Sequence, residues 1–279
     1  MRTPSALAVL LAAVAVVVLA LGAGSAAQGQ GGATPGEIPP ALNPCLGPEA
    51  ADLLCPNLRM QPPSDLFVSE TRSGRRLLHA TNSIDSRGEG PAELRGKRNG
   101  KHYMDADQRI RLRSGGRRTV KTPAFLGFKN IPGQGGYWKY KDAALFEIWT
   151  LDENDNPVQL VRTGPKVYYC LRDLVRTRAM SGSPPRRVYP ACNQNRRTAA
   201  VTLGTSVGWS DVYPSSYHEQ YIDVSGLRGR YGFVHIADPG NGIWENDEDD
   251  NAGMTIVSLP SGKPLGSRGG MPRPSGVSR

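Results

Sequence analysis

The sequence is poor in the residues from which metal clusters, membrane spans and helices are built. Its four histidines are His79, His102, His218 and His235, and no two of them are two or four residues apart. No C-x-x-C pair is present, so a common structural zinc site is not indicated. After residue 21 no stretch is long and apolar enough to span a membrane. Outside the first residues, helical apolar spacing never exceeds two turns, which disfavours a helical fold.

Glycine and proline are frequent instead, with 33 and 23 copies among the 279 residues. This content is too high for a helical bundle, and the glycines lack the period of collagen. The hydrophobic fraction of 38% is enough for a folded core. Lysine and arginine outnumber aspartate and glutamate by 34 to 25, a net charge of +9 that favours anionic surfaces or polymers as partners.

The chain begins with the pattern of a secretory signal. Arg2 supplies a positive start, residues 6–21 are apolar, and residues 24–27 are small. These features predict a signal peptide over residues 1–27 with cleavage after Ala27, and hence a secreted, extracellular protein. An uncleaved membrane anchor is the alternative, although the apolar run is shorter than the about 20 residues that a spanning helix needs. Secretion also argues against a nucleic-acid partner.

Four cysteines in a secreted chain predict two disulfide bonds. Three connectivities are open to four cysteines. The pairs that are close in sequence are favoured, namely Cys45 with Cys55 and Cys170 with Cys192.

Composition divides the chain into a tether, one domain and a tail. Residues 28–44 are rich in glycine, proline and glutamine, and residues 261–279 form a basic Gly/Pro/Ser tail; both are predicted to be disordered. Between them, residues 45–260 contain short segments of period-two apolar alternation separated by turn residues, such as the hairpin turn expected at residues 152–157. The fold class predicted is an all-β sandwich with long, disulfide-stapled loops.

Residues 204–208 read G-T-S-V-G and match the G-x-S-x-G pattern of serine hydrolases. In those enzymes Ser206 would stand on a tight turn between a strand and a helix. The following residues, W-S-D-V-Y-P, do not predict a helix. A glycine-flanked loop between strands is therefore the preferred interpretation, with a hydrolase as a distant alternative.

A series of segments in a fixed order resembles the catalytic domain of the lysyl oxidases, which are secreted copper amine oxidases, and in particular their actinobacterial-type relatives. The segments are 53–58, 78–82, 88–96, 137–149, 166–173 (KVYYCLRD), 208–213 (GWSDVY), 220–224, 229–233 and an acidic run that ends at Asn251. Together they span most of residues 53–251. The fold of that family is a β-sandwich, as the strand pattern also predicts.

The resemblance implies oxidative deamination of primary amines by Cu²⁺ and a lysine tyrosylquinone. The cofactor would form from Lys166 and Tyr213, which stand at the matching positions. The copper ligands of the family are three alternating histidines, a spacing that aims three imidazoles at one ion from a strand. Here the corresponding residues are Tyr137, Lys139 and Lys141. An ammonium group offers no lone pair to a metal and adds positive charge, so copper binding is expected to be lost.

The acidic run, E-N-D-E-D-D-N over residues 245–251, contains the oxygen ligands that Ca²⁺ prefers. From composition alone a solvated acidic loop is the preferred interpretation. The resemblance implies a calcium site, whose ligands would be Glu245, Asp247, Asp250, Asn251, the side chain of Asn57 and the carbonyl of Leu58. Asn57 replaces an aspartate of the family, so weaker binding is expected.

Two functions follow from these observations. The first is a secreted lysyl-oxidase-like protein that lacks copper, is non-catalytic or altered, and binds amine-bearing or anionic polymers or proteins of the cell envelope. The second is an active amine oxidase with an unconventional metal site, completed by Tyr137 with His102 or His218.

Overall fold

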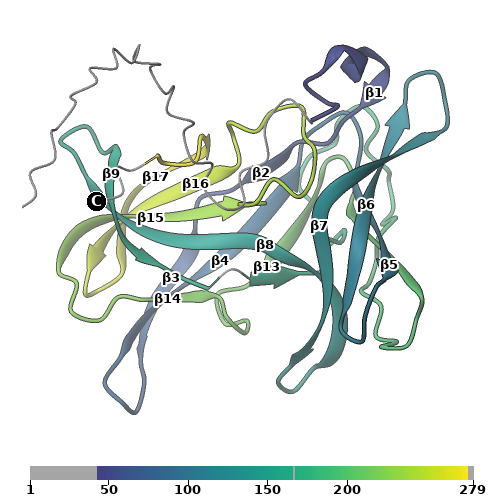
Figure 1. Cartoon of the computed structure of the whole chain (residues 1–279). Coiled ribbons are helices and arrows are strands. Elements are labelled where there is room, and N and C mark those ends of the chain that lie inside the picture. The colour runs from purple at the N-terminus through teal and green to yellow at the C-terminus, as the bar shows by residue number, and fades with distance from the viewer. Residues whose placement is uncertain (1–42, 166, 276–279) are drawn as a thin grey trace, which may run out of the picture. The chain divides into compact units, whose positions relative to one another are not determined.

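The computed structural model describes residues 43–165 and 167–275, and in them the chain is built almost entirely of antiparallel β-strands (Figure 1). The single helical element of this part is a short 3-10 turn, η2 (Pro48–Asp52). The expected all-β, disulfide-stapled fold is confirmed. No helix in the described ranges is both long and apolar enough to cross a membrane.

Among the described residues, the larger sheet has 11 strands, and β5, β6, β7 and β8 are neighbours in it in the order of the chain. Its path is β12 (Ala200–Thr205), β5 (Ala92–Arg98), β6 (Tyr103–Leu112), β7 (Arg117–Ile131), β8 (Gly135–Leu151), β15 (Gly229–Ala237), β16 (Ala252–Leu259) and β17 (Lys263–Met271). Off this path, β1 (Leu53–Leu54) pairs with β6, and β9 (Pro157–Thr163) and β10 (Val167–Tyr169) pair with β8.

The smaller sheet is centred on β4 (Arg76–Ser86). Its path is β11 (Val175–Arg176), β13 (Trp209–Tyr213), β4 and β14 (Tyr221–Asp223), and β2 (Leu58–Met60) and β3 (Ser64–Glu70) also pair with β4. Along β4 the residues Leu78, Ala80, Asn82 and Ile84 are buried, which is the period-two burial of a strand with one face on a core.

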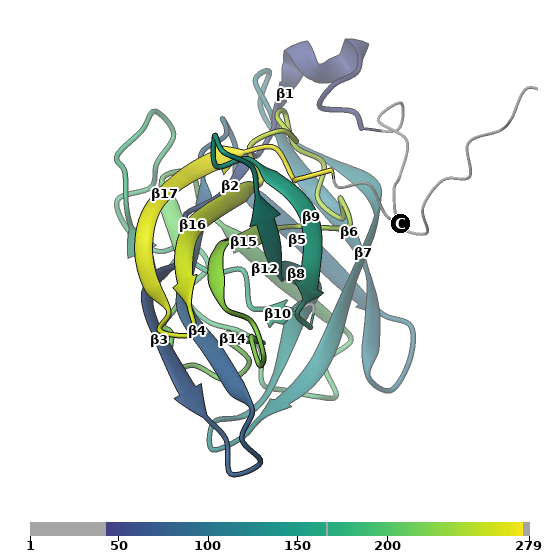
Figure 2. The ribbon, with the colours of Figure 1, turned by 90° about the vertical axis from the view of Figure 1, so that its left-hand side faces the viewer.

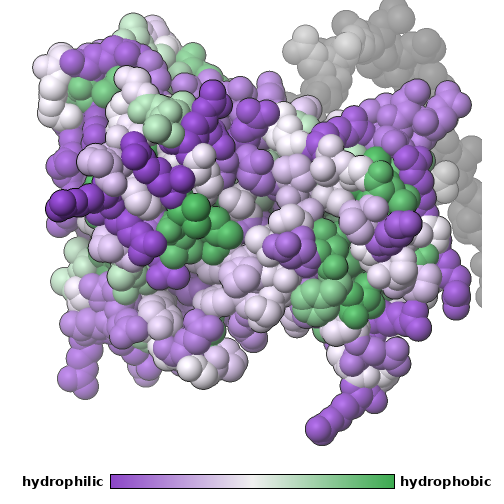
Figure 3. All heavy atoms as spheres, turned by 180° about the vertical axis from the view of Figure 1, so that it is seen from behind, coloured by the Kyte–Doolittle hydropathy of each residue, from purple (hydrophilic) through white to green (hydrophobic). Residues whose placement is uncertain are grey.

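One core cluster joins the two sheets. It includes Ile84 and Ile222 from the smaller sheet and Leu126, Phe146 and Phe233 from the larger one. In Figure 2, strands β3, β4 and β14 of the smaller sheet lie beside β15, β16 and β17. The surface opposite to that seen in Figure 1 is mostly hydrophilic, and its hydrophobic residues form separate patches (Figure 3).

Strand β8 contains a residue with a left-handed backbone conformation between its two pairing regions. Asp142 has φ of 60°, a left-handed conformation that residues with a side chain adopt rarely. Before it, residues 135–140 pair with β7, and after it, residues 144–149 pair with β15. The same strand therefore carries side chains in two parts of the sheet.

Both predicted disulfides are present, with Cα–Cα distances of 5.9 Å for Cys45–Cys55 and 5.7 Å for Cys170–Cys192. The predicted hairpin turn also forms, because Asp152 accepts hydrogen bonds from the amides of Asn154 and Asn156 between β8 and β9.

The structure corrects both predicted disordered ends within the residues it describes. Asn43, the first described residue, was placed in the tether, yet it is only 4% exposed and hydrogen-bonded to the acidic loop. Residues Lys263–Met271, placed in the disordered tail, form strand β17. The pairing of β17 with β16 runs through backbone groups, so a composition of glycine, proline and arginine does not prevent it.

Candidate functional site: a buried lysine among tyrosines

Lys139 lies on β8 with its ammonium group inside the protein. The residue is 1% exposed, and it stands opposite Gly127 of β7. Its Nζ donates to the hydroxyl of Tyr217 at 3.2 Å and to the backbone carbonyl of Tyr168 at 3.4 Å. Buried lysines are rare unless they are paired, so this placement calls for specific partners.

Three tyrosine rings form those surroundings. Tyr213 stacks on Tyr169 with 3.9 Å between ring centroids, and Tyr217 meets Tyr213 edge to face at 5.1 Å. The Lys139 Nζ lies 5.6 Å from the Tyr213 ring centroid and 5.3 Å from that of Tyr217. At these distances a ring quadrupole attracts a cation. The Tyr213 hydroxyl accepts a hydrogen bond from the Cys170 amide at 2.8 Å, which fixes the ring.

Asp211 of β13 is the acidic member of the cluster, and it is fully buried. Its carboxylate interacts with the Leu171 backbone and with the Tyr213 hydroxyl, and both contacts favour its ionised form. Burial raises its pKa to about 7, and the charges of Arg172 and Lys139 oppose the rise. Burial likewise lowers the pKa of Lys139 to about 8, although Asp211 favours its charged form. Near pH 7 Lys139 is therefore mainly protonated and Asp211 is only partly ionised, so the ammonium is not fully balanced by this carboxylate.

The other two residues at the expected copper positions point elsewhere. The hydroxyl of Tyr137 donates to the carbonyl of Gln134 at 2.7 Å. The Lys141 Nζ lies 3.8 Å from a carboxylate oxygen of Asp142, with 41% of the side chain exposed. Burial along this part of β8 does not alternate, because Trp138, Lys139 and Tyr140 are consecutive buried residues.

The residues present do not fit copper. Across residues 43–165 and 167–275, no three His, Cys, Asp or Glu side chains are grouped to hold a metal ion. The two histidines considered as replacements have other neighbours: both ring nitrogens of His102 lie within 2.9 Å of the Arg196 guanidinium, and His218 lies 3.5 Å from Glu219. The Lys139 ammonium occupies the central position instead.

The two remaining histidines are also structural. His79 shares a hydrogen bond of 2.8 Å with Ser69. His235 is buried, stacks on Phe146 with 4.0 Å between centroids and meets Asn82 at 3.1 Å. Burial lowers the pKa of His235 to about 3, so the ring is neutral, as expected for a packing residue.

Of the predicted quinone pair, Tyr213 is described and Lys166 lies outside the described residues. The Tyr213 ring faces Lys139, as given above.

Most of the predicted calcium residues lie around the acidic loop, although no three of its carboxylates are grouped as in a metal site within residues 43–165 and 167–275. Glu245 is fully buried and accepts hydrogen bonds from the Leu58 amide and from the Asn251 amide group, the latter at 3.1 Å. Asn57 donates to Asp250 at 3.3 Å. Among the predicted ligands, the side-chain oxygens without a partner are Asn57 Oδ1, Asp250 Oδ1 and Asn251 Oδ1. Asp247 differs, since it is exposed and accepts the Asp249 amide.

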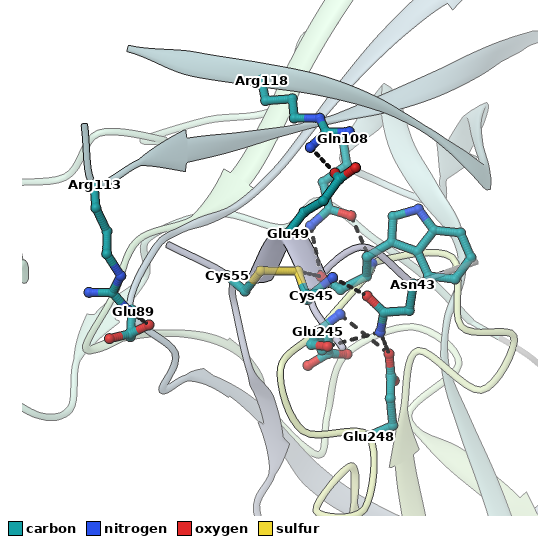
Figure 4. Close-up of a disulfide and its surroundings, with 11 residues drawn as sticks. Asn43, Cys45, Glu49, Cys55, Glu89, Gln108, Arg113, Arg118, Glu245 and Glu248 are labelled. Atoms are coloured by element: carbon teal, nitrogen blue, oxygen red, sulfur yellow. Dashed lines mark hydrogen bonds and ion pairs between the residues drawn. A yellow bond between two sulfur atoms is a disulfide. The ribbon is translucent and has the colours of Figure 1, made fainter. Parts of the chain in front are cut away.

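Two residues of this loop region were not predicted, Asn43 and Glu248. Figure 4 shows Asn43 beside the Cys45–Cys55 disulfide, with its side chain directed at Glu245 and Glu248. Its amide group donates to the Glu245 carbonyl and to Glu248 Oε1, each at 2.9 Å. Burial raises the pKa of Glu248 to about 8, and its Oε2 has no partner among the described residues. Glu248 lies in the acidic run, whereas nothing in the sequence signalled Asn43.

Of the expected loop at residues 204–208, residues 206–208 form the connection between β12 and β13, while Gly204 and Thr205 belong to β12. Ser206 is 2% exposed, and its hydroxyl donates to Asp173 at 2.9 Å. Asp173 also accepts the backbone amides of Ser206, Val188 and Tyr189. A buried serine bonded to a structural carboxylate lacks the exposed hydroxyl of a hydrolase nucleophile.

No family model and no curated protein matches the chain. The likeness to lysyl oxidases therefore depends on the ordered motifs given under Sequence analysis.

Proposed function

We propose that this protein is a secreted, copper-free relative of the lysyl oxidases that acts by binding rather than by oxidising amines. The observation that carries the proposal is the buried Lys139 ammonium, which takes the central position of the expected copper site and contacts Tyr217 and Tyr168. A cation with no lone pair is the opposite of a metal ligand.

The burial of Lys139 adds to this argument. Burial is the main cause that lowers the pKa of Lys139, and the charges of Lys129 and Arg172 add to it, whereas Asp211 and Glu219 oppose it. Without copper the family's quinone does not form, so Tyr213 is proposed to serve as a packing residue. Two disulfides support an oxidising, extracellular location.

We also propose that the acidic loop binds Ca²⁺ as a structural ion. Support comes from three side-chain oxygens without a partner, one of them on Asn251, which is 4% exposed. Glu245 and Asp250 would supply charged carboxylate oxygens, and Asn57 and Asn251 would supply neutral amide oxygens. Oxygen ligands of both kinds are those that calcium prefers. The ion would bridge β2 and the loop before β16.

Copper loading tests the catalytic part of the proposal. The purified natural chain is incubated with Cu²⁺ in air, and bound metal, quinone absorbance and peroxide release with a diamine are measured. We expect less than one-tenth equivalent of tightly bound copper and no peroxide. Stoichiometric copper together with peroxide would overturn the proposal.

A variant in which the copper site is restored provides the complementary test. It carries three substitutions, Tyr137→His, Lys139→His and Lys141→His. It restores alternating imidazoles on β8 and should take up copper. The matched control places the same three histidines at Val158, Leu160 and Arg162, exposed positions of β9 with the same spacing. The control should bind copper by spacing alone but form no quinone, because Tyr213 is not its neighbour.

A further inference from the structure

The surface beside Lys139 contains two adjoining pockets that the proposed loss of copper does not explain. The first, of about 360 Å³, is lined by His102, Tyr103, Gly127, Phe128, Lys129 and Tyr168. The second, also of about 360 Å³, is lined by Asn99, Gly100, Tyr103, Phe125 and Lys141. Tyr103 is common to both and stands between them. Each volume is in the range of small-ligand sites.

Aromatic rings form much of the walls. Tyr103 is 51% exposed and Phe125 46% exposed, an unusual exposure for large rings on one sheet surface. In the first pocket the Tyr168 ring lies over Gly127, where an added Cβ would approach Tyr168 Cε1 to 2.7 Å. Glycine at this position therefore keeps the pocket open beneath the ring. Flat rings of this kind suit the C–H face of a pyranose ring, which is apolar while its edge carries hydroxyls.

The rim of the first pocket is positively charged. The Arg196 guanidinium lies 5.7 Å from the Phe128 ring centroid and 2.8 Å from His102 Nδ1. Within the described part of the chain, neither Arg196 nor Lys101 has a carboxylate partner. Arg98, close by, donates to backbone carbonyls at Thr198 and Gly100.

The acidic groups near the pockets are already engaged. Glu219 pairs with Lys129, and Asp142 lies 3.8 Å from Lys141. Asp105 accepts a hydrogen bond from the Asn99 side chain. The unbalanced charge at the rim is therefore positive, and it would repel the primary amines that the family oxidises.

We propose that the two pockets bind consecutive units of an acidic oligosaccharide, with pyranose rings against the exposed rings of Tyr103 and Phe125 and a carboxylate on Arg196. A planar guanidinium with free N–H groups matches a carboxylate in a bidentate manner. The proposal deepens the binding role given under Proposed function by naming the ligand class. The pKa of His102 is lowered by loss of solvent around its ring. The neighbouring charges of Arg196, Lys101 and Arg98 lower it further.

Calorimetric titration of the full chain tests the proposal with three probes. Trigalacturonate supplies rings and carboxylates, maltotriose supplies rings alone, and a triglutamate peptide supplies three side-chain carboxylates without rings. We expect trigalacturonate to bind at least tenfold more tightly than either control and more weakly as salt is added. If maltotriose binds as tightly as trigalacturonate, the carboxylates do not contribute to affinity. If triglutamate binds as tightly or more tightly, the ligand is an acidic peptide. Either result overturns the proposal.

Two variants locate the site. Arg196→Gln and Tyr103→Ala each change an exposed side chain, so both should fold, as melting temperature checks. Each should weaken trigalacturonate binding at least fivefold. Arg228→Gln removes the same charge from an exposed position between β14 and β15 and should stay within twofold. Unchanged affinity in Arg196→Gln would overturn the placement of the carboxylate.

The outcome is separable from the copper test. Peroxide release by the natural chain would end the proposal of a non-catalytic role and leave the sugar titration unaffected. Absence of trigalacturonate binding would end the present inference and leave the loss of copper intact.

Discussion

The Lys139 ammonium lies 5.6 Å from the centre of the Tyr213 ring, and both side chains are buried. The two residues come from different sheets, β8 and β13, so their contact forms only when the sheets pack. A tyrosine that the resemblance would place beside a metal thus faces a cation of the protein itself. The contact is attractive and supports packing.

Asp211 should make stability depend on pH. Its pKa is raised from the ordinary 3.8 to about 7, so the folded state holds a proton that the unfolded state has released. Its contribution to stability is full below about pH 4 and is lost as pH rises through 7, by a few kcal/mol. Urea unfolding of the natural chain and of Asp211→Asn at pH 4, 5.5 and 7 measures this. The variant should gain relative stability as pH rises, and a constant difference would contradict the assignment.

Calcium should stabilise the fold through the acidic loop. At a free concentration of 100 times Kd, a single bound ion adds about 2.7 kcal/mol to the free energy of unfolding. Thermal unfolding in calcium and after chelation should therefore differ by several degrees. Glu245→Gln should remove the difference, while Asp249→Asn, at an exposed neighbouring position, should keep it. No shift in the natural chain would rule out the site.

Replacing Asn57 by aspartate should strengthen calcium binding. The Asn57 side chain lies beside Asp250, and its Oδ1 has no partner among the residues described. An added carboxylate raises the ligand charge, which increases affinity for Ca²⁺. Titration with a calcium indicator should show a lower Kd for Asn57→Asp. Without calcium the same variant should be less stable, because two carboxylates then repel each other.

Asp173 should be essential for the loop around Ser206. Its carboxylate is fully buried and accepts four hydrogen bonds, including that of the Ser206 hydroxyl. Asp173→Ala should lower the free energy of unfolding by about 3 kcal/mol or more, because three backbone amides lose their acceptor. Ser206→Ala removes one of the four bonds and should cost about 1 kcal/mol. Equal losses in the two variants, measured by chemical unfolding, would contradict this account.

The parts of the fold that sequence predicted are local ones. Alternation along β4, the turn at Asp152 and the pairing of near cysteines all depend on neighbours in the chain. The surroundings of Lys139 were not predictable, because Tyr217 and Asp211 reach it from other elements. The acidic run was recognised as a ligand-rich segment, whereas its contact with Asn43 spans 205 residues.

Strand β17 has a consequence for the stability of the protein in solution. It covers the edge of β16, whose residues Ala252–Leu259 are nearly all buried. Its own residues are largely exposed and include Lys263, Pro264 and Arg268, the kinds of side chain that prevent strands of different molecules from pairing. A chain cut before Lys263 would expose β16 as a long apolar edge. Strand β17 thus protects the larger sheet against aggregation.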